Sequence, residues 1–218
     1  MTIATEAKAL LKDRAYLKIK QSIQRSEFSP GEFLSERQLA GLLGMSKTPV
    51  KAALERLEAE GFVVVSPQQG IVVRDLSVHE IADQFEIRLA LESFVLRSIA
   101  GKLDDVQTAQ LQKNLSQQSR AARTVDLSTA VALDSQFHSL FCEFLGNAEI
   151  IRVMLHLREK MHRVVTRVFE KTPTRLQAGY KEHCAIAEAV MNGDANRATA
   201  ALEEHLNYGK QLLLSPRR

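Results

Sequence analysis

The stretch that decides the fold is SPGEFLSERQLAGLLGMSKTPVKAALERLEAEGFVVVSPQQGIVV, residues 29–73. Its first part predicts a short helix over 35–43. Ser35 is a good N-cap, because a serine hydroxyl can accept a hydrogen bond from an otherwise unpaired amide of the first turn. Gly44 ends the helix where the chain must turn. The apolar side chains at helical spacing are expected to face inward: Leu39, Leu42 and Leu43.

The second part of the stretch predicts another helix and then a hairpin. Ser46 is expected to cap the helix, and Pro49 is compatible with its first turn because no backbone donor is needed there. Gly61 should end the helix, whose buried stripe would be Val50, Ala53, Leu54 and Leu57. Two β-rich runs, 62–65 and 71–73, flank a turn and are typical of a wing. Helix, turn, helix and wing in this order predict a winged helix-turn-helix that binds DNA.

The same residues resemble the N-terminal domain of GntR-family bacterial transcription regulators. The match stays in register over about 45 residues and consists of Pro30-Gly31, Leu34-Ser35-Glu36, Leu39-Ala40, LGMSKTPV over 43–50, ALERLEAEG over 53–61, and the wing glycine Gly70. The resemblance implies contacts to DNA bases or phosphates from Arg37, Ser46, Lys47, Thr48, Lys51, Gln69 and Gly70.

The chain departs from the usual pattern of that family at two positions. Lys47 and Lys51 stand where family members commonly have arginine. A lysine ammonium is a point charge and lacks the planar fork that reads guanine O6 and N7 in a bidentate manner. The alternative interpretation of both residues is that they solvate an exposed helix face.

Composition agrees with a regulator of two domains but does not require one. The chain has 218 residues, enough for two modest cores, and its net charge is only +3. The charge is uneven, because residues 1–25 carry six basic side chains against two acidic ones. A basic first helix beside the reading helix would meet phosphates, and its apolar side, Tyr16, Ile19 and Ile23, is expected to be core.

The sequence favours a cytoplasmic protein. The N-terminus has no hydrophobic signal core, and no apolar run approaches the roughly 20 residues of a membrane span. The two cysteines show no CxxC spacing and suit a reducing compartment.

After residue 75 the pattern of apolar and polar residues changes, so we expect two domains, 1–75 and 76–218. Strand-like runs disappear and helical periodicity continues almost to the end. The fold class is therefore mainly α, with the winged helix-turn-helix followed by an all-helical bundle. Short links favour antiparallel neighbours, and the breaks predict six helices: 77–101, 104–122, 126–145, 147–170, 174–192 and 194–213.

Four residues of the helical half could hold a metal ion. Asp134 and His138 are four apart and share one helix face. His183 and His205 each lie eleven residues from the turn at 194, so in an antiparallel hairpin they stand at the same height, about 16 Å from that turn. Three imidazoles and a carboxylate suit zinc, nickel, iron or manganese. The alternative is that these histidines are half-buried polar residues, the class to which His79, His156 and His162 are assigned.

This second half resembles the FCD domain, the helical effector-binding domain of the fatty-acid-regulator-like branch of the GntR family. Many members carry a D-x-x-x-H pair, a histidine in the penultimate helix, another in the last helix, and an arginine on the first. The matching positions here are Asp134, His138, His183, His205 and Arg88. The resemblance implies that the first four bind a metal, most commonly zinc, and that Arg88 binds the effector. Six helices would place the chain nearer the vanillate-regulator-like subgroup.

A mechanism follows from these assignments by linkage. A metal with residual positive charge and Arg88 would favour a small carboxylate effector. An effector that changes DNA affinity must bind two arrangements of the protein unequally, at about 1.4 kcal/mol per tenfold change. We expect a homodimer on a short palindromic operator, with repression relieved by a metabolite.

Two other functions are compatible with the sequence. In a metal sensor the ion itself would be the signal. In a metal-dependent hydrolase the ion would activate water. Against the hydrolase, the chain has no nucleophile elbow and no phosphate-cradling glycine loop, and Glu182 and Glu204 should point away from the sites of the histidines beside them.

Overall fold

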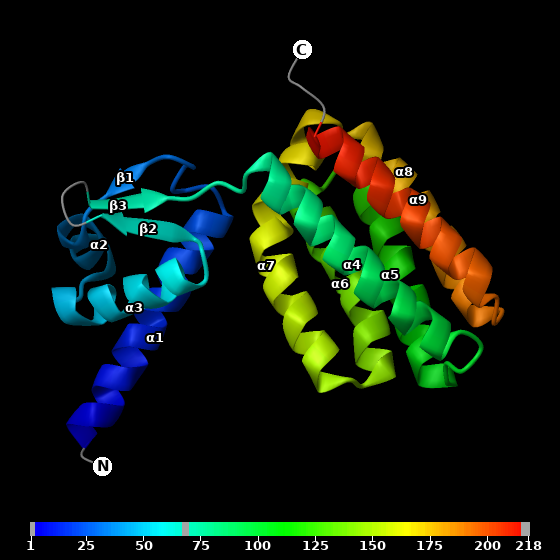
Figure 1. The fold of residues 1–218 in the computed structure, drawn as a ribbon, viewed down its shortest axis with the longest axis horizontal. Coiled ribbons are helices and arrows are strands. Elements are labelled where there is room, and N and C mark those ends of the chain that lie inside the picture. The colour runs from blue at the N-terminus through cyan, green and yellow to red at the C-terminus, as the bar shows by residue number, and fades with distance from the viewer. Residues whose placement is uncertain (1–2, 67–69, 215–218) are drawn as a thin grey trace. The chain divides into compact units, whose positions relative to one another are not determined.

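The computed structural model describes residues 3–66 and 70–214, and Figure 1 shows their arrangement. The chain divides into two compact units, Met1–Asp75 and Leu76–Arg218. Each unit has its own cluster of buried apolar side chains. No helix among the described residues has the length and apolar character needed to cross a membrane.

The first unit is a winged helix-turn-helix, as predicted. Its elements are α1 (Ile3–Gln24), β1 (Phe33–Leu34), α2 (Glu36–Leu43), α3 (Lys47–Ala59), β2 (Val63–Ser66) and β3 (Gly70–Val73). The antiparallel sheet has the order β1-β3-β2, with Val64 opposite Val72 in the wing hairpin. The short strand β1 was not predicted, because two residues carry no periodic signal.

Local signals fix both ends of α2. The Ser35 hydroxyl accepts from the Gln38 amide, while the Gln38 side chain accepts from the Ser35 amide, which is a complete capping box. Gly44 ends the helix in the left-handed conformation, with φ of 62°. The prediction that Leu42 faces inward is wrong, since it is 71% exposed. The buried face is set by Leu39 and Ala40, and Leu42 follows Ala40 by two positions, about 200° around the helix.

A buried ion pair joins α1 to the end of α3. Lys20 is 5% exposed, and its Nζ lies 3.0 Å from Glu60 Oε2 and 2.6 Å from the Tyr16 hydroxyl. Lys20 is thus one basic residue of the first helix that is committed to partners inside this unit and is not available to phosphate. Its apolar neighbours Tyr16, Ile19 and Ile23 are buried, as predicted.

The second unit is the predicted bundle, with six helices among the described residues: α4 (Val78–Ile99), α5 (Asp105–Thr124), α6 (Leu127–Leu145), α7 (Ala148–Lys171), α8 (Thr174–Met191) and α9 (Ala195–Leu214). Each differs from its predicted bounds by at most two residues at either end. Asn147 caps α7 by accepting from the amides of Glu149 and Ile150, and Gly146 ends α6 with φ of 73°.

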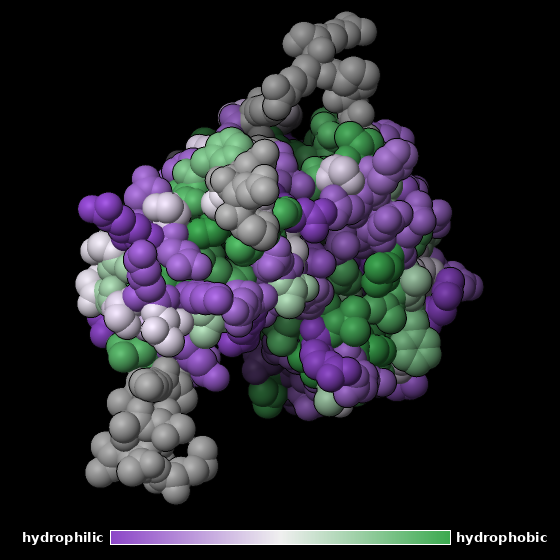
Figure 2. Space-filling view, turned by 60° about the vertical axis from the view of Figure 1, so that its left-hand side comes forward, coloured by the Kyte–Doolittle hydropathy of each residue, from purple (hydrophilic) through white to green (hydrophobic). Residues whose placement is uncertain are grey.

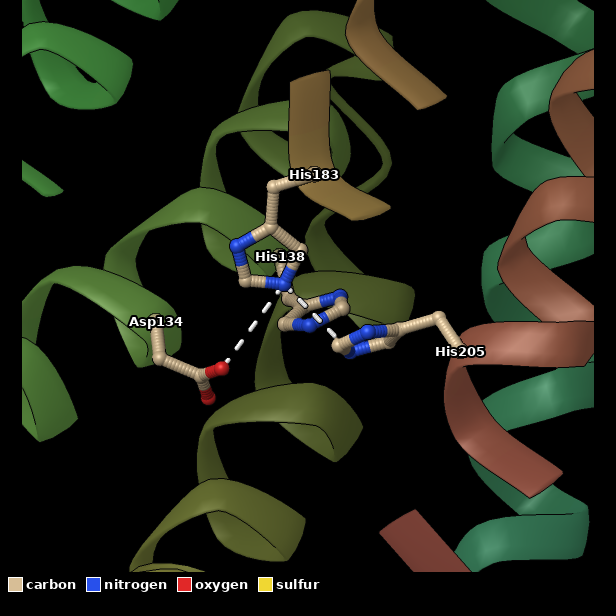
Figure 3. A group of neighbouring side chains, drawn as sticks. All are labelled: Asp134, His138, His183 and His205. Carbon is tan, nitrogen blue, oxygen red and sulfur yellow. Dashed lines mark hydrogen bonds and ion pairs between the residues drawn. The ribbon is translucent and has the colours of Figure 1, made fainter. Parts of the chain in front are cut away.

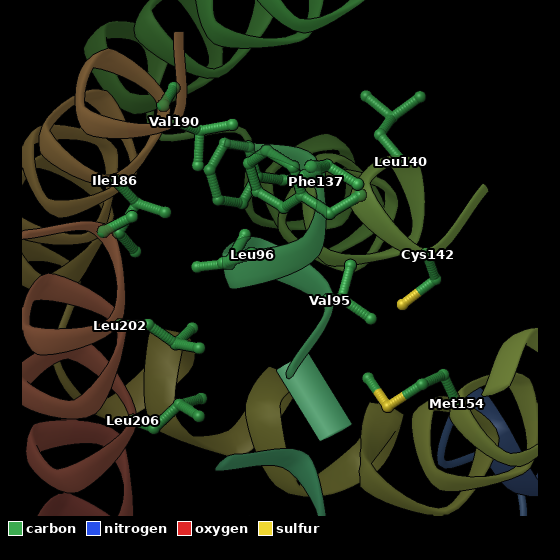
Figure 4. Close-up of a cluster of buried hydrophobic side chains, with 14 of the residues drawn as sticks. Val95, Leu96, Phe137, Leu140, Cys142, Met154, Ile186, Val190, Leu202 and Leu206 are labelled. Carbon is green, nitrogen blue, oxygen red and sulfur yellow. The ribbon is translucent and has the colours of Figure 1, made fainter. Parts of the chain in front are cut away.

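Five of these helices form a closed ring. Each packs on two others in the order α4, α9, α8, α5, α6 and back to α4, and α7 covers α6 and α4. Residues buried inside the ring include Leu96, Phe137, Ile186 and Leu202 (Figure 4). Hydrophilic side chains cover much of the visible surface, with apolar areas between them (Figure 2). A ring of this kind can direct polar side chains from several helices toward one point in its interior.

Candidate metal centre and nucleic-acid interface

The four predicted ligands lie together inside the helical ring. Asp134 and His138 come from α6, His183 from α8 and His205 from α9, and Figure 3 shows the four side chains pointing toward one another. One possible ligand atom from each lies within 4.8 Å of every other. The three histidines are at most 7% exposed. A single ion could therefore contact all four side chains.

The two histidines on the last helix pair face each other at the same height, as predicted from their equal distance to the turn. Nε2 of His183 lies 3.3 Å from Nε2 of His205 and 3.7 Å from Oδ1 of Asp134. The ring of His183 stacks on Phe137, with the two ring centroids 4.1 Å apart. The stacking fixes the plane of the imidazole and aims its Nε2 at the centre of the cluster.

In each of the three histidines, Nδ1 lies within hydrogen-bond distance of an acceptor on a different helix. His138 Nδ1 lies 2.6 Å from Glu92 Oε2, and His205 Nδ1 lies 2.6 Å from Glu182 Oε2. His183 Nδ1 lies 2.8 Å from Gln118 Oε1. Because all three partners accept, each Nδ1 is assigned the proton and each Nε2 presents a lone pair inward. This is the tautomer that binds a metal through Nε2.

The donor set fits a metal ion. His138 Nε2 is buried and has no hydrogen-bond partner among the described residues. His183 and His205 direct two Nε2 lone pairs at each other across 3.3 Å, an arrangement that is unfavourable without a cation nearby. Buried polar groups in proteins are nearly always satisfied. A divalent ion bound by three imidazoles and the Asp134 carboxylate satisfies all of these atoms at once.

Protonation does not compete strongly for the same nitrogens. Burial, together with the nearby charges of His205 and His138, holds the pKa of His183 well below its ordinary value. Burial also lowers the pKa of His205, although its hydrogen bond to Glu182 acts in the opposite direction. Near pH 7 both imidazoles are therefore neutral, which is the form that ligates metals.

Glu92 belongs to the site and was not identified from the sequence. It is 3% exposed and bridges His138 to Arg88, whose Nε donates to its Oε1 at 2.8 Å. Burial raises the pKa of Glu92, but the charges and hydrogen bonds of His138 and Arg88 outweigh burial and lower that pKa to about 2. Glu92 therefore stays ionised. Its position four residues after Arg88 is the signal that could have placed it beside that arginine.

Two further supporting residues were also missed. Glu182 points away from the site of its neighbour His183, as expected, but it reaches His205 on the next helix. Its carboxylate also accepts two hydrogen bonds from Arg175, each 2.5 Å long. Gln118 donates from its Nε2 to Asn114 Oδ1 at 2.7 Å, which orients its oxygen toward His183. These outer contacts orient the three histidine rings of the cluster.

Pockets meet the cluster at Asp134. One pocket is lined by residues that include Arg88, Asp134, Arg175 and His205. It is open to solvent, and its empty space is about 450 Å³ when the solvent-filled part is included. A second pocket of about 440 Å³, measured in the same way, lies between α4, α6 and α7 and is also lined by Arg88 and Asp134. Arg88 and Asp134 thus border space that a small ligand could fill. His79 and His156 are exposed and lie outside the cluster.

The residues predicted to contact DNA lie on the exposed side of the first unit. Lys47, Thr48 and Lys51 are exposed on α3, and Arg37 is exposed on α2. The opposite face of α3 is buried through Val50, Ala53, Leu54 and Leu57, as predicted. The face of α3 that carries Lys47, Thr48 and Lys51 is therefore not part of the core of this unit.

The remaining predicted DNA contacts lie around the two turns of this unit. Ser46 occupies the N-cap position of α3, but its hydroxyl makes no capping hydrogen bond. Gln69 lies outside the described residues. Gly70 has φ of +89°, and a Cβ built there would lie 3.0 Å from the Leu34 carbonyl oxygen. The need for glycine at position 70 therefore has a structural cause apart from any DNA contact.

Both units match families of known proteins. The FCD domain family matches residues 83–208, and the family described as "Bacterial regulatory proteins, gntR family" matches residues 11–73. An HTH-type transcriptional regulator in an unstable DNA locus of Streptomyces ambofaciens is 31% identical over 193 residues, covering 88% of this chain and 80% of that protein. The HTH-type transcriptional repressor RspR of Escherichia coli (strain K12) is 26% identical over 209 residues, covering 94% and 91%.

A solved structure agrees with these matches at the level of the fold. E. coli McbR/YncC has a TM-score of 0.78 and 22% identity to this chain, and the match covers 93% of this chain and 96% of the other. The FCD match alone covers more than half of the 218 residues. The chain therefore belongs to the GntR family of bacterial transcriptional regulators, which are not enzymes, and carries an FCD domain after its winged helix-turn-helix.

Proposed function

We propose that this protein is a cytoplasmic, metabolite-responsive repressor that binds a palindromic operator as a homodimer and takes a small carboxylate effector at a metal-containing pocket of its FCD domain. The observation that carries the proposal is the inward set of Nε2 atoms, with His138 Nε2 buried and unpartnered among the described residues. The relative named as the repressor RspR supports the sense of regulation.

The metal would be held by Asp134, His138, His183 and His205. Zinc suits the three nitrogens and one oxygen best, and nickel, iron or manganese could also be accepted. When bound, the ion supplies a positively charged coordination position for an anionic ligand. The protein's own part is to hold the imidazoles in one tautomer through Glu92, Gln118 and Glu182 and to exclude bulk water from their Nε2 atoms.

Arg88 would bind the effector beside the metal. Its Nε is committed to Glu92, while its side chain lines both of the pockets described above, each of which also includes Asp134. A guanidinium fixed by a carboxylate on one edge presents its other donors in a set direction. A small carboxylate can then use Arg88 and the metal together, which favours this class of ligand over neutral metabolites.

The operator would be read by α3. Exposed lysines on that helix supply charge for phosphate contacts and donors for base edges, and Arg37 adds a further cation from α2. Because Lys47 and Lys51 lack the bidentate fork of arginine, we expect them to contribute more to affinity than to discrimination of guanine.

An exposed apolar stripe on α4 supports pairing with a second copy. Ile87 is 42% and Phe94 is 54% exposed, and the small Ala90 lies between them. Two copies of α4 packed antiparallel about residues 90 and 91 would place Ile87 on Phe94 of the second copy. The same pairing brings the exposed Asp83 of one copy near the exposed Arg97 of the other. Such self-complementarity is what a two-fold interface requires.

We predict that Phe94→Asp weakens self-association by roughly 100-fold or more, because the two-fold interface buries the new charge twice. Analytical ultracentrifugation over a concentration series measures the change. Val106→Asp is the matched control, since Val106 is 67% exposed on α5, away from the stripe. A Phe94→Asp protein that stays as dimeric as the wild type would show that this face of α4 is not the interface.

The proposed function is tested on an operator selected from random duplexes by the zinc-loaded protein. Operator affinity is measured by fluorescence anisotropy with and without a panel of small carboxylates, for the wild type and Asp134→Ala. We expect at least one acid to weaken binding of the wild type and to have no effect on the variant. If zinc alone switches the affinity and no acid changes it further, the protein is a metal sensor. If neither does, the proposal fails.

A further inference from the structure

The pocket between α4, α6 and α7, called here the α7 pocket, contains polar groups that the proposed metal site does not use. Arg88 and Asp134 line it on the side of the four ligands, and Arg158 and His162 line it from α7. Apolar side chains make up much of the remaining lining, namely Val131, Met154, Leu157, Met161 and Val165. From the sequence alone, His162 was interpreted as a half-buried polar residue without a ligand role.

Arg158 differs from the other arginines near the site. Arg88 is paired with Glu92, and Arg175 is paired with Glu182. Arg158 instead donates from Nη1 to the neutral Ser139 hydroxyl at 3.1 Å and has no carboxylate partner among the described residues. A guanidinium at the edge of a pocket without a counter-ion is available to an incoming anion.

His162 lies one turn after Arg158 on the same face of α7. Its side chain is half-buried, and neither ring nitrogen has a hydrogen-bond partner among the described residues. Burial, with the charge of Arg158, lowers the pKa of His162, so near pH 7 the ring is neutral and carries one N–H donor. Arg158 and His162 thus form a second group of donors that face the pocket.

The pocket lining contains one acidic residue, Asp134, which the proposed function assigns to the metal. A ligand in the α7 pocket would therefore meet cationic groups from α4 and α7 and an apolar surface. Flexible Met154 and Met161 can adapt to a short alkyl or aromatic spacer.

We propose that the effector is a dianion, most simply a dicarboxylate with a short apolar spacer, whose first carboxylate binds at Arg88 and the metal and whose second binds Arg158 and His162. The inference rests on the proposed function and specifies its ligand class. Arg158 and His162 are then the residues that select dicarboxylates over monocarboxylates of equal length.

The test is titration calorimetry of the zinc-loaded full-length protein with straight-chain dicarboxylates of four to eight carbons and the matched monocarboxylates. We expect at least one dicarboxylate to bind about tenfold or more tightly than its matched monocarboxylate, because it gains a charge-assisted contact. Arg158→Gln should remove that preference and leave monocarboxylate binding unchanged. Arg158 is exposed, so the variant should fold. Arg152→Gln, on the same helix but paired with Glu149 and outside the pocket lining, should keep the preference.

Equal affinity of every matched pair in the wild type, or a preference that survives Arg158→Gln, would overturn the inference. The proposed function is judged separately, by whether any acid changes operator affinity through Asp134. If a monocarboxylate releases the operator and the matched dicarboxylate binds no more tightly, the dicarboxylate assignment is wrong and the proposed function stands.

Discussion

Replacing Asp134 and His205 together with alanine is expected to abolish stoichiometric metal binding and leave operator binding partly intact. Two of the four inward ligand atoms are lost, and the remaining pair, His138 and His183, cannot close a four-coordinate site. The loss of metal affinity should exceed the roughly 10- to 100-fold loss that follows removal of a residue hydrogen-bonded to a ligand. Competition with a chromogenic chelator measures the affinity, and elemental analysis of the purified protein measures the stoichiometry.

Gln118→Ala provides the graded comparison for this experiment. It keeps all four ligands and removes only the acceptor behind His183 Nδ1, which is 2.8 Å away. We expect zinc affinity to fall by roughly 10- to 100-fold, between the wild type and the double variant. If the double variant still binds one zinc ion as tightly as the wild type, the assignment of these residues as ligands is wrong.

Replacing Lys47 and Lys51 with alanine is expected to have the opposite effect, with loss of operator binding and normal metal content. Both side chains are exposed on α3, whose other face is packed in the core, so the fold should be retained. If each lysine neutralises one phosphate, the slope of log affinity against log salt should decrease in magnitude by about 2. Fluorescence anisotropy at several salt concentrations measures both the affinity and the slope.

The control for that variant must change the net charge by the same amount. Lys113→Ala with Lys181→Ala does so at exposed positions on α5 and α8 of the helical unit. We expect this pair to leave the salt slope almost unchanged, because long-range charge effects are screened at physiological ionic strength. Equal losses in both double variants would show that α3 is not the reading helix.

Much of the fold could be predicted because its signals are local. Ser35, Gly44 and Gly146 mark helix ends through their own backbone and side-chain preferences, and the structure places each at such an end. Leu42 was misplaced because an eight-residue helix gives too few apolar positions to fix its inward face. The pair Phe33–Leu34 became a strand only because β3 lies beside it, which is a tertiary effect.

The proximity of two candidate ligands could be predicted for a geometric reason, since equal distance from one turn brings His183 and His205 together in any antiparallel hairpin. The supporting residues had no such rule. Glu92 and Gln118 are 46 and 65 residues from the histidines they contact, so only the closed ring of helices brings them near. Glu182 was set aside because it neighbours His183 in sequence, while its partner is His205.

The ion pair between Lys20 and Glu60 has a consequence for how this family can vary. The two partners differ in what their loss would change, because without Lys20 the Glu60 carboxylate keeps Arg56 Nε at 3.1 Å and the Tyr16 hydroxyl at 2.7 Å, whereas loss of Glu60 takes a carboxylate away from a lysine side chain that is only 7% exposed. Position 60 is therefore more constrained than position 20, since one carboxylate serves three side chains. Among related sequences an acidic residue at position 60 should be retained more strictly than lysine at position 20.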